Sequence, residues 1–144
     1  MPVADDWSWT DDFQGPAGQP PDPGAWGYEL GAGGWGCEQP QHYTSSPGNA
    51  RLTGAGQLAI TARREADGRI TSARLITKGR VTARYGRVEA RIRVPAERGT
   101  WTAFWMLGHD IDEVGWPACG EIDVMEQVAV DPNRVHGKIG RAHV

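Results

Sequence analysis

The stretch from Gly120 to Glu126 alternates acidic and apolar residues, and this pattern constrains the fold more than any other part of the chain. Successive side chains of a β-strand point to opposite faces, so Glu121 and Asp123 share one face and the apolar residues between them take the other. Strict alternation would turn Glu126 to the apolar face. A one-residue β-bulge at Val124-Met125 corrects the phase, and we therefore predict a strand with all three acids on one face.

Three crowded carboxyl groups cannot all ionise freely, so the pKa of at least one should rise while that of another stays low. A retaining glycosidase needs such a split, with one carboxylate as nucleophile and one protonated carboxyl as acid, about 5–5.5 Å apart. From the acids alone, a solvated acidic strand or a calcium site explains the pattern equally well.

Several other segments of the chain carry motifs that, together with the acids, resemble one known family. In chain order these are Gly33-Gly34-Trp35-Gly36, Gln41-His42-Tyr43-Thr44, Thr71-Ser72-Ala73-Arg74-Leu75, Tyr85-Gly86-Arg87-Val88-Glu89-Ala90-Arg91, Trp101-Thr102-Ala103-Phe104-Trp105-Met106-Leu107-Gly108 and Trp116-Pro117-Ala118-Cys119. Together with Gly120-Glu121-Ile122-Asp123-Val124-Met125-Glu126 they resemble glycoside hydrolase family 16, in the bulged form typical of laminarinases (endo-β-1,3-glucanases). The resemblance extends from near Trp9 to near Gly137.

The resemblance implies an all-β jelly-roll sandwich of two antiparallel sheets, of the concanavalin A-like kind, with an open cleft on its concave face. Twenty glycines and ten prolines agree with a fold that has many turns. The residue patterns themselves predict strands at Tyr85–Val94 and Trp101–Leu107. They also predict a hairpin in which Asp67-Gly68 joins strands at Leu58–Ala62 and Ile70–Leu75.

The resemblance also implies a chemistry for the acids. Glu121 is expected to be the nucleophile, Glu126 the acid and then the base, and Asp123 the residue that holds Glu121 in place. The reaction implied is endo-acting, retaining cleavage of a β-1,3-glucan or a mixed β-1,3/1,4-glucan by double displacement. Two alternatives stay open, namely a non-catalytic β-glucan-binding module of the same fold and a transglycosylase.

Tryptophan is the residue type most suited to binding the substrate, because a flat indole face stacks on a sugar ring. The chain has seven tryptophans. The expected substrate-binding residues are Trp35, Glu38, Arg74, Trp101, Trp105, Trp116 and His136. Most of them also have a purely structural interpretation: core packing for the tryptophans, an ion pair for Arg74 and an ordinary surface position for His136.

The length of the chain is short for the expected fold. A sandwich of this type usually has about 200–250 residues, whereas this chain has 144. We therefore expect residues 1–138 to be part of a catalytic domain that is truncated at its C-terminus, and the chain as given to be inactive and prone to aggregate. Residues 139–144 do not resemble the family. They can be back-translated to a nucleotide sequence that resembles a common sequencing-library adapter. We expect a non-native tail there, which resequencing the locus would test.

Composition excludes two classes of partner. The net charge is −3 and there is no basic run, so a nucleic-acid-binding surface is not expected. No apolar stretch approaches the about 18–20 residues of a membrane span. A polysaccharide substrate implies an extracellular location, although no signal peptide is visible at the N-terminus.

Cofactors and disulfides are less constrained by the sequence. The resemblance implies a β-glucan partner, no required cofactor and no catalytic metal, and a monomer when the domain is whole. It allows a structural calcium ion near Asp11-Asp12-Phe13-Gln14-Gly15. Cys37 and Cys119 are either a disulfide or two free thiols, and the sequence does not decide between them.

Overall fold

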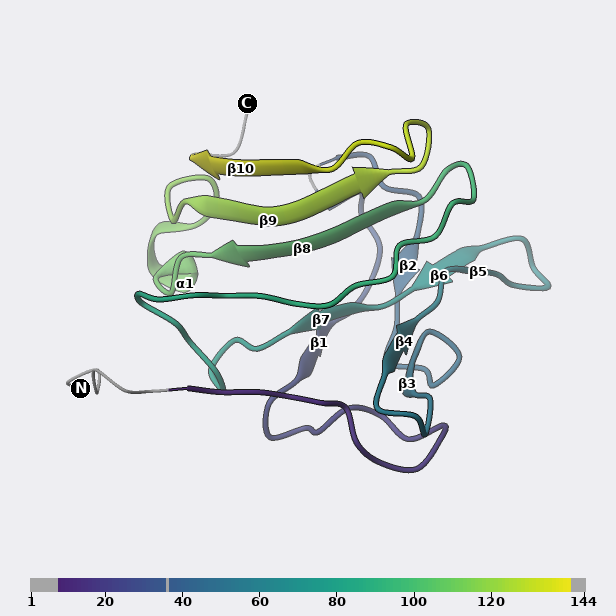
Figure 1. Cartoon of the computed structure of the whole chain (residues 1–144). Coiled ribbons are helices and arrows are strands. Elements are labelled where there is room, and N and C mark those ends of the chain that lie inside the picture. Colours follow the sequence, from purple (N-terminus) through teal and green to yellow (C-terminus); the bar gives the residue numbers. More distant parts are fainter. Residues whose placement is uncertain (1–7, 36, 141–144) are drawn as a thin grey trace. The chain divides into compact units, whose positions relative to one another are not determined.

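The computed structural model describes residues 8–35 and 37–140, and the chain divides into two compact units, Met1–Tyr85 and Gly86–Val144. We refer to them as the N-terminal unit and the C-terminal unit (Figure 1). The described residues form β-strands and a single short helix, which confirms the expected all-β class. No helix among them is long and apolar enough to cross a membrane.

The N-terminal unit contains seven short strands in three small sheets. They are β1 Gly27–Glu29, β2 His42–Tyr43, β3 Ala50–Leu52, β4 Leu58–Ile60, β5 Arg63–Arg64, β6 Ile70–Ser72 and β7 Arg74–Ile76. β1 pairs antiparallel with β7, and β3 pairs antiparallel with β4. β6 lies between β2, with which it is parallel, and β5, with which it is antiparallel.

The hairpin expected around Asp67-Gly68 is confirmed at the turn and wrong in both strands. The expected strand Ile70–Leu75 is divided into β6 and β7, which belong to different sheets. The turn is present, with the Arg69 amide donating to Asp67 Oδ1 at 3.0 Å. The strand that enters it is β5, whereas β4 pairs with β3 instead. The reason is a second tight turn at residues 53–57, closed by a bond from the Thr53 amide to the Gln57 carbonyl at 2.9 Å. It gives β4 a nearer antiparallel partner than the segment beyond Asp67-Gly68.

The C-terminal unit is built on one antiparallel sheet with the strand order β10-β9-β8 (Figure 1). Its elements are β8 Trp101–Leu107, the four-residue helix α1 Ile111–Val114, β9 Glu121–Val128 and β10 His136–Gly140. The strands predicted at Trp101–Leu107 and around Glu121–Glu126 are therefore confirmed. β9, which carries the three acids, is the central strand and is held on both edges.

The segment Tyr85–Val94 is not a strand, contrary to its alternating sequence. No backbone hydrogen bond joins residues 86–94 to another segment of the described chain. Its polar side chains pair locally instead of across strands, with Arg87 donating to Glu89 two positions on. The alternation is that of a strand, but a strand also needs a neighbouring backbone to pair with, and this segment has none here.

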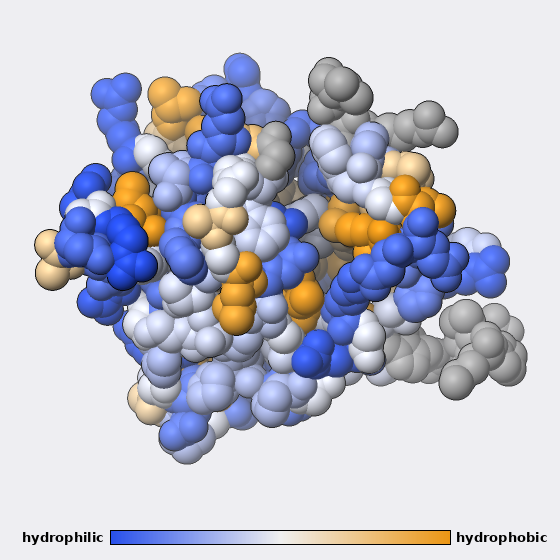
Figure 2. Space-filling view, turned by 180° about the vertical axis from the view of Figure 1, so that it is seen from behind, coloured by the Kyte–Doolittle hydropathy of each residue, from blue (hydrophilic) through white to orange (hydrophobic). Residues whose placement is uncertain are grey.

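The buried apolar side chains of the described residues are few and mostly small. They are Ala25, Ala50, Leu52, Ala73 and Ala129. Many larger apolar side chains are exposed instead, and Figure 2 shows hydrophobic side chains at the surface among hydrophilic ones. The expected tendency of the chain to aggregate stays a prediction.

Asp11 has a structural role at the edge where the family resemblance allows calcium. Its carboxylate accepts a hydrogen bond from the Phe13 amide at 2.7 Å and one from Trp26 Nε1 at 2.8 Å. Trp26 in turn packs against Trp9 and Phe13, with ring centroids 5.9 Å apart in both pairs. Among residues 8–35 and 37–140 no group of three or more side chains is arranged to hold a metal ion. Calcium binding stays a prediction.

Candidate active site

The three acids of β9 lie on one face of the sheet because the strand is bulged. Phe104 of β8 pairs with Met125, and the next residue, Trp105, pairs with Asp123, so Val124 has no partner. This one-residue irregularity confirms the predicted bulge and returns Glu126 to the face of Glu121 and Asp123. Two of the acids on that face are buried, with Asp123 8% and Glu126 9% exposed, while Glu121 is part-buried and Val124 is 37% exposed.

Glu121 is held from two directions. Trp116, in the loop between α1 and β9, donates its indole N–H to Glu121 Oε2 at 2.8 Å. Asp123, two positions along the strand, shares a side-chain hydrogen bond with Glu121. The bond shared by the two carboxyls requires one proton between them. Because burial raises the pKa of Asp123, Asp123 is the acid that holds this proton.

Glu126 has two partners of its own. Trp101, at the start of β8, donates its indole N–H to Glu126 Oε1 at 3.1 Å. Lys138 of β10 forms an ion pair with Glu126 Oε2. The hydrogen bond to Glu126 raises the pKa of the Lys138 ammonium, and the charges of Glu126, Asp123 and Glu121 add to this effect. The charge of the Lys138 ammonium group therefore interacts with all three carboxyls, as expected if they share a face.

The pKa of Asp123 is raised from 3.8 to about 6. Burial is the largest cause, because it disfavours the charged form. The hydrogen bond to Glu121 and the charges of Glu121 and Glu126 act in the same direction, while Lys138 opposes them. The sequence predicted that crowding would raise one of the three pKa values, and the structure assigns that shift to Asp123.

Three of the four tryptophans expected to bind sugar lie beside the acids, namely Trp101, Trp105 and Trp116, and two of them also hydrogen-bond to the acids directly. Trp101 and Trp116 are 51% and 50% exposed, so each keeps part of its ring open while its N–H holds a glutamate. Trp105 lies directly across from Asp123 on β8 and is part-buried. The sequence suggested stacking platforms, but it did not indicate the two indole N–H bonds.

His136 and Lys138 come from β10. His136 pairs with Glu126 in the ladder, which places it beside the acids, and it is exposed. Lys138 pairs with Asp123 and was not singled out from the sequence. The signal that could have found it is its spacing, because Lys138 follows His136 by two positions and therefore shares its face.

The other expected substrate-binding residues belong to the N-terminal unit. The Arg74 guanidinium lies over the Trp35 ring, 4.8 Å from its centroid, and forms an ion pair with Glu29. Trp35 also packs edge-on against Tyr43 at 5.4 Å. Glu38 is exposed in the same glycine-rich loop, where both Trp35 and Glu38 have positive φ values, 49° and 53°. Trp35 and Arg74 are therefore adjacent, and their binding roles stay predictions.

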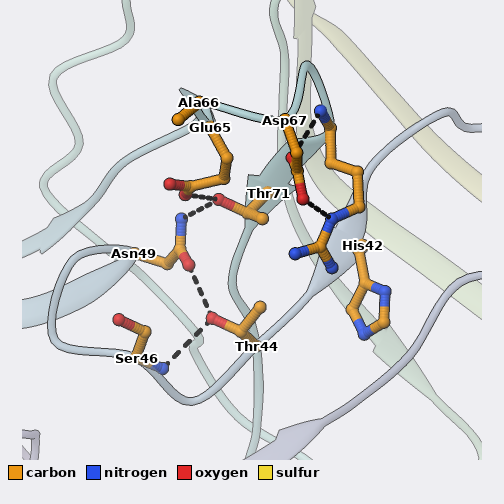
Figure 3. Close-up of a pocket in the computed structure, with 9 residues that line it drawn as sticks. His42, Thr44, Ser46, Asn49, Glu65, Ala66, Asp67 and Thr71 are labelled. Atoms are coloured by element: carbon orange, nitrogen blue, oxygen red, sulfur yellow. Dashed lines mark hydrogen bonds and ion pairs between the residues drawn. The ribbon is translucent and has the colours of Figure 1, made fainter.

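A polar pocket of about 490 Å³ in the N-terminal unit contains none of the expected site residues. Its wall is a chain of side-chain hydrogen bonds through Thr44, Asn49, Thr71 and Glu65 (Figure 3). Asn49 is 2% exposed, and its amide is fully paired by this chain and by the Thr61 carbonyl. The network satisfies buried polar groups and so stabilises the turn that carries Asn49.

The two cysteines are both free thiols in the structure. Cys37 is exposed and Cys119 is part-buried. Of the two interpretations left open by the sequence, the structure therefore has the unpaired one. Neither thiol contacts the acids of β9 through a described hydrogen bond, since Cys119 donates only to the Gly120 carbonyl, at 3.4 Å.

Comparison with known families gives a match over most of the chain. The family model described as Glycosyl hydrolases family 16 matches residues 38–139, which include β8, β9 and most of β10. The three acids of β9 all lie within the matched range.

Individual relatives agree with the family match. A β-glucanase of Rhodothermus marinus is 45% identical over 136 residues, which is 91% of this chain and 46% of the relative. A glucan endo-1,3-β-glucosidase of Cryptopygus antarcticus is 36% identical over 138 residues, 91% of this chain and 49% of the relative. The chain thus spans about half the length of the curated relatives it matches.

A solved structure gives the same relationship in three dimensions. The laminarinase of Rhodothermus marinus superposes with a TM-score of 0.84 at 45% identity, over 92% of this chain and 54% of the laminarinase. At this identity the match confirms the jelly-roll class that the motifs implied. It also agrees with the expectation that the chain corresponds to part of such a domain.

Proposed function

Because the chain belongs to glycosyl hydrolase family 16, we propose that it forms the acid-bearing part of a retaining, endo-acting glycoside hydrolase. The substrate proposed is a β-1,3-glucan or a mixed β-1,3/1,4-glucan. The observation that carries the proposal is the bulged strand β9, which puts three carboxyls on one face with tryptophans beside them. The names of the relatives, which include a β-glucanase and a laminarinase, support the substrate class.

In the first step, Glu121 attacks the anomeric carbon and forms a covalent glycosyl ester while the glycosidic bond breaks. Glu126, protonated at this stage, gives its proton to the departing oxygen. The Trp116 N–H and the proton on Asp123 both bond to Glu121 and fix the direction of its carboxylate. Since both donors belong to the protein, no water has to reorganise around the nucleophile.

In the second step, Glu126 is a carboxylate and takes a proton from water, whose oxygen attacks the anomeric carbon and releases Glu121. Two inversions give net retention. Trp101 holds Glu126 in both steps through its indole N–H, which can bond to either form of the carboxyl. Asp123 hydrogen-bonds to Glu121 when that carboxylate is released.

The ion pair with Lys138 uses the carboxylate form of Glu126, which is the form needed in the second step. The first step needs the protonated form, so the pair has to open when substrate enters. Lys138 is 50% exposed at its side chain and can therefore swing into solvent. We expect Lys138→Thr to raise the rate of the first step, because this substitution removes the ion pair with Glu126.

The proposed location is extracellular, because a polysaccharide of this class does not enter cells. A monomer is the proposed state of a whole domain. A transglycosylase would use the same acids with a sugar acceptor in place of water, and a glucan-binding module would use the tryptophans alone. The paired and shielded acids favour catalysis over binding alone, since a binding module has no use for a buried carboxyl with a raised pKa.

The test is a chimera in which this chain replaces the corresponding part of the Rhodothermus marinus β-glucanase. We expect it to release reducing sugar from laminarin, with lichenan and agarose showing how far the linkage preference extends. Glu121→Gln and Glu126→Gln should each lower the rate by several orders of magnitude while laminarin binding persists. An unchanged rate in Glu121→Gln would contradict the proposal, and binding without any turnover in the unsubstituted chimera would favour the binding module.

A further inference from the structure

The polar pocket of the N-terminal unit has the size of a ligand site and includes no residue of β9. Its volume of about 490 Å³ falls within the range of about 300–1,000 Å³ that is usual for pockets that bind small molecules. Its lining residues lie between His42 and Thr71, so the pocket belongs to one unit. It is therefore a candidate for a site of its own.

The floor of the pocket is a buried network whose hydrogen bonds are made within the protein. Thr71 is 5% exposed, and its hydroxyl donates to Glu65 Oε1 at 2.7 Å and accepts from the Asn49 amide at 3.0 Å (Figure 3). His42 is paired with Thr71 in the parallel pairing of β2 with β6, so the two side chains share a face of that sheet. The floor is therefore held in place, and His42 lies beside it.

A tight turn holds the other side of the pocket in one conformation. The Glu65 amide donates to the Arg69 carbonyl at 2.8 Å and closes the turn. Asp67 then accepts two hydrogen bonds from Arg69, one from the backbone amide at 3.0 Å and one from Nε at 2.7 Å. Because the guanidinium is already held by Asp67, a ligand that binds it has less side-chain freedom to remove.

Several hydrogen-bonding groups at the pocket have no partner within the described part of the chain. Arg69 uses Nε in the turn, whereas its terminal nitrogens Nη1 and Nη2 make no described hydrogen bond. Glu65 accepts from Thr71 at Oε1, and Oε2 accepts no described hydrogen bond. The ring nitrogens of His42 make none either. Arg69 is exposed, and Glu65 and His42 are half-buried, so donors and acceptors are both open to a ligand.

The charges at the pocket disfavour an anion or a metal ion as its ligand. Two carboxylates, Glu65 and Asp67, line it beside one guanidinium, so an anion would meet net repulsion. In the described part of the chain no group of three or more acidic, histidine or cysteine side chains could hold a metal ion. A neutral sugar fits better, because each sugar hydroxyl both donates and accepts, as the guanidinium donors and carboxylate acceptors here require.

We propose that this pocket is a second sugar-binding site, which takes a short segment of a neutral β-glucan. The choice of a β-glucan rests on the proposed function. Arg69 donates to sugar hydroxyls, Glu65 Oε2 accepts from them, and His42 does either through its two ring nitrogens. The site holds a polysaccharide without cleaving it, because none of the acids of β9 lines it.

The experiment is a titration of the chimera with laminaritetraose, a short soluble β-1,3-glucan, followed by amide NMR on isotope-labelled protein. Glu121→Gln is included to prevent turnover. We expect the amides of residues 42–44 and 65–71 to shift together, with one dissociation constant for this group. The amides of β9 report separately on any binding beside the acids, so the two sites are measured in one experiment.

Matched variants identify the groups that bind. Arg69→Ala and His42→Ala each remove hydrogen-bonding groups without touching the buried network, and should weaken binding at the pocket by about threefold to tenfold. Unchanged shifts elsewhere in each spectrum show that the variant is folded. The control is Arg64→Ala, which removes an exposed arginine of β5 that does not line the pocket, and it should leave the dissociation constant unchanged.

Three results would overturn the proposal. The first is that the amides of residues 42–44 and 65–71 do not respond to the sugar. The second is that sodium sulfate shifts the same amides and displaces the sugar, which would make the pocket an anion site. The third is binding by the 144-residue chain alone that is lost in the chimera, because the rest of the domain would then cover the pocket.

Failure of the proposed function gives a different pattern. A chimera with Glu121 intact that never cleaves laminarin, but binds laminaritetraose at the pocket, would support the second site and count against catalysis alone. Cleavage of laminarin with no response at residues 65–71 would do the reverse.

Discussion

Asp123 is held in its protonated form up to a higher pH than an ordinary aspartic acid. Its pKa is raised to about 6, with burial as the main cause and Glu121 as the next. We predict that carboxyl-carbon NMR of the chain gives a titration midpoint for Asp123 near this value. Glu121→Gln should lower the midpoint without restoring 3.8, because burial remains. The matched control Glu113→Gln, an exposed residue of α1, should leave it unchanged.

The same shift has a consequence for stability. Between pH 3.8 and about pH 6, the folded state holds a proton on Asp123 that the unfolded chain releases. The folded state binds more protons in this window, so the free energy of unfolding contributed by Asp123 falls as the pH rises through it. Asp123→Asn should remove that slope in denaturant titrations at several pH values. A slope that persists in the variant would mean that another group is responsible.

Trp116 gives a second prediction at the residue scale. Trp116→Phe keeps an aromatic face for sugar but removes the N–H that bonds to Glu121. A hydrogen bond to a charged group contributes about 1.5–3 kcal/mol, so kcat of the chimera should fall by roughly one to two orders of magnitude. KM should change little if the N–H positions the nucleophile. A raised KM with kcat intact would show that Trp116 is chiefly a sugar platform.

The control for that experiment is Trp9→Phe, which makes the same substitution at an exposed tryptophan of the N-terminal unit. It should leave kcat and KM of the chimera as they were. A loss equal to that of Trp116→Phe would point to a general effect of losing an indole.

At the scale of elements, the bulge in β9 makes a prediction about deletions. Removing Val124 leaves Glu121, Asp123 and Glu126 at alternate positions, so an unbulged strand still carries all three on one face. Removing Ile122 makes Glu121 and Asp123 neighbours that point to opposite faces. We therefore expect the chimera without Val124 to keep measurable glucanase activity and the one without Ile122 to lose it. Equal loss in both would mean that β9 tolerates no deletion.

The elements also show what sequence patterns can and cannot predict. β9 was predictable, bulge included, because three acids on one face require a phase correction that can be counted in the sequence. Tyr85–Val94 has an equally clear alternation, yet it forms no ladder, since pairing depends on a partner strand that the pattern does not contain. The turn at Asp67-Gly68 was likewise correct while its entering strand was not, because a nearer turn competed.

The candidate site likewise has features that the sequence predicts and features that it does not. The acids and the tryptophans were identifiable from residue type and spacing. The indole bonds from Trp101 and Trp116 were not, because the direction of a side chain depends on three-dimensional packing. Lys138 was overlooked because a cation on a neighbouring strand becomes a partner only when the register is known.

At the scale of the whole molecule, the central claim is that Glu121 and Glu126 act in succession on one glycosidic bond. The most direct test is NMR of the first products released from laminarin by the chimera, before mutarotation equilibrates the anomers. Double displacement predicts that the new reducing ends appear first as the β-anomer and then equilibrate. Early α-anomer would mean a single displacement by water, and would contradict the roles given to both glutamates.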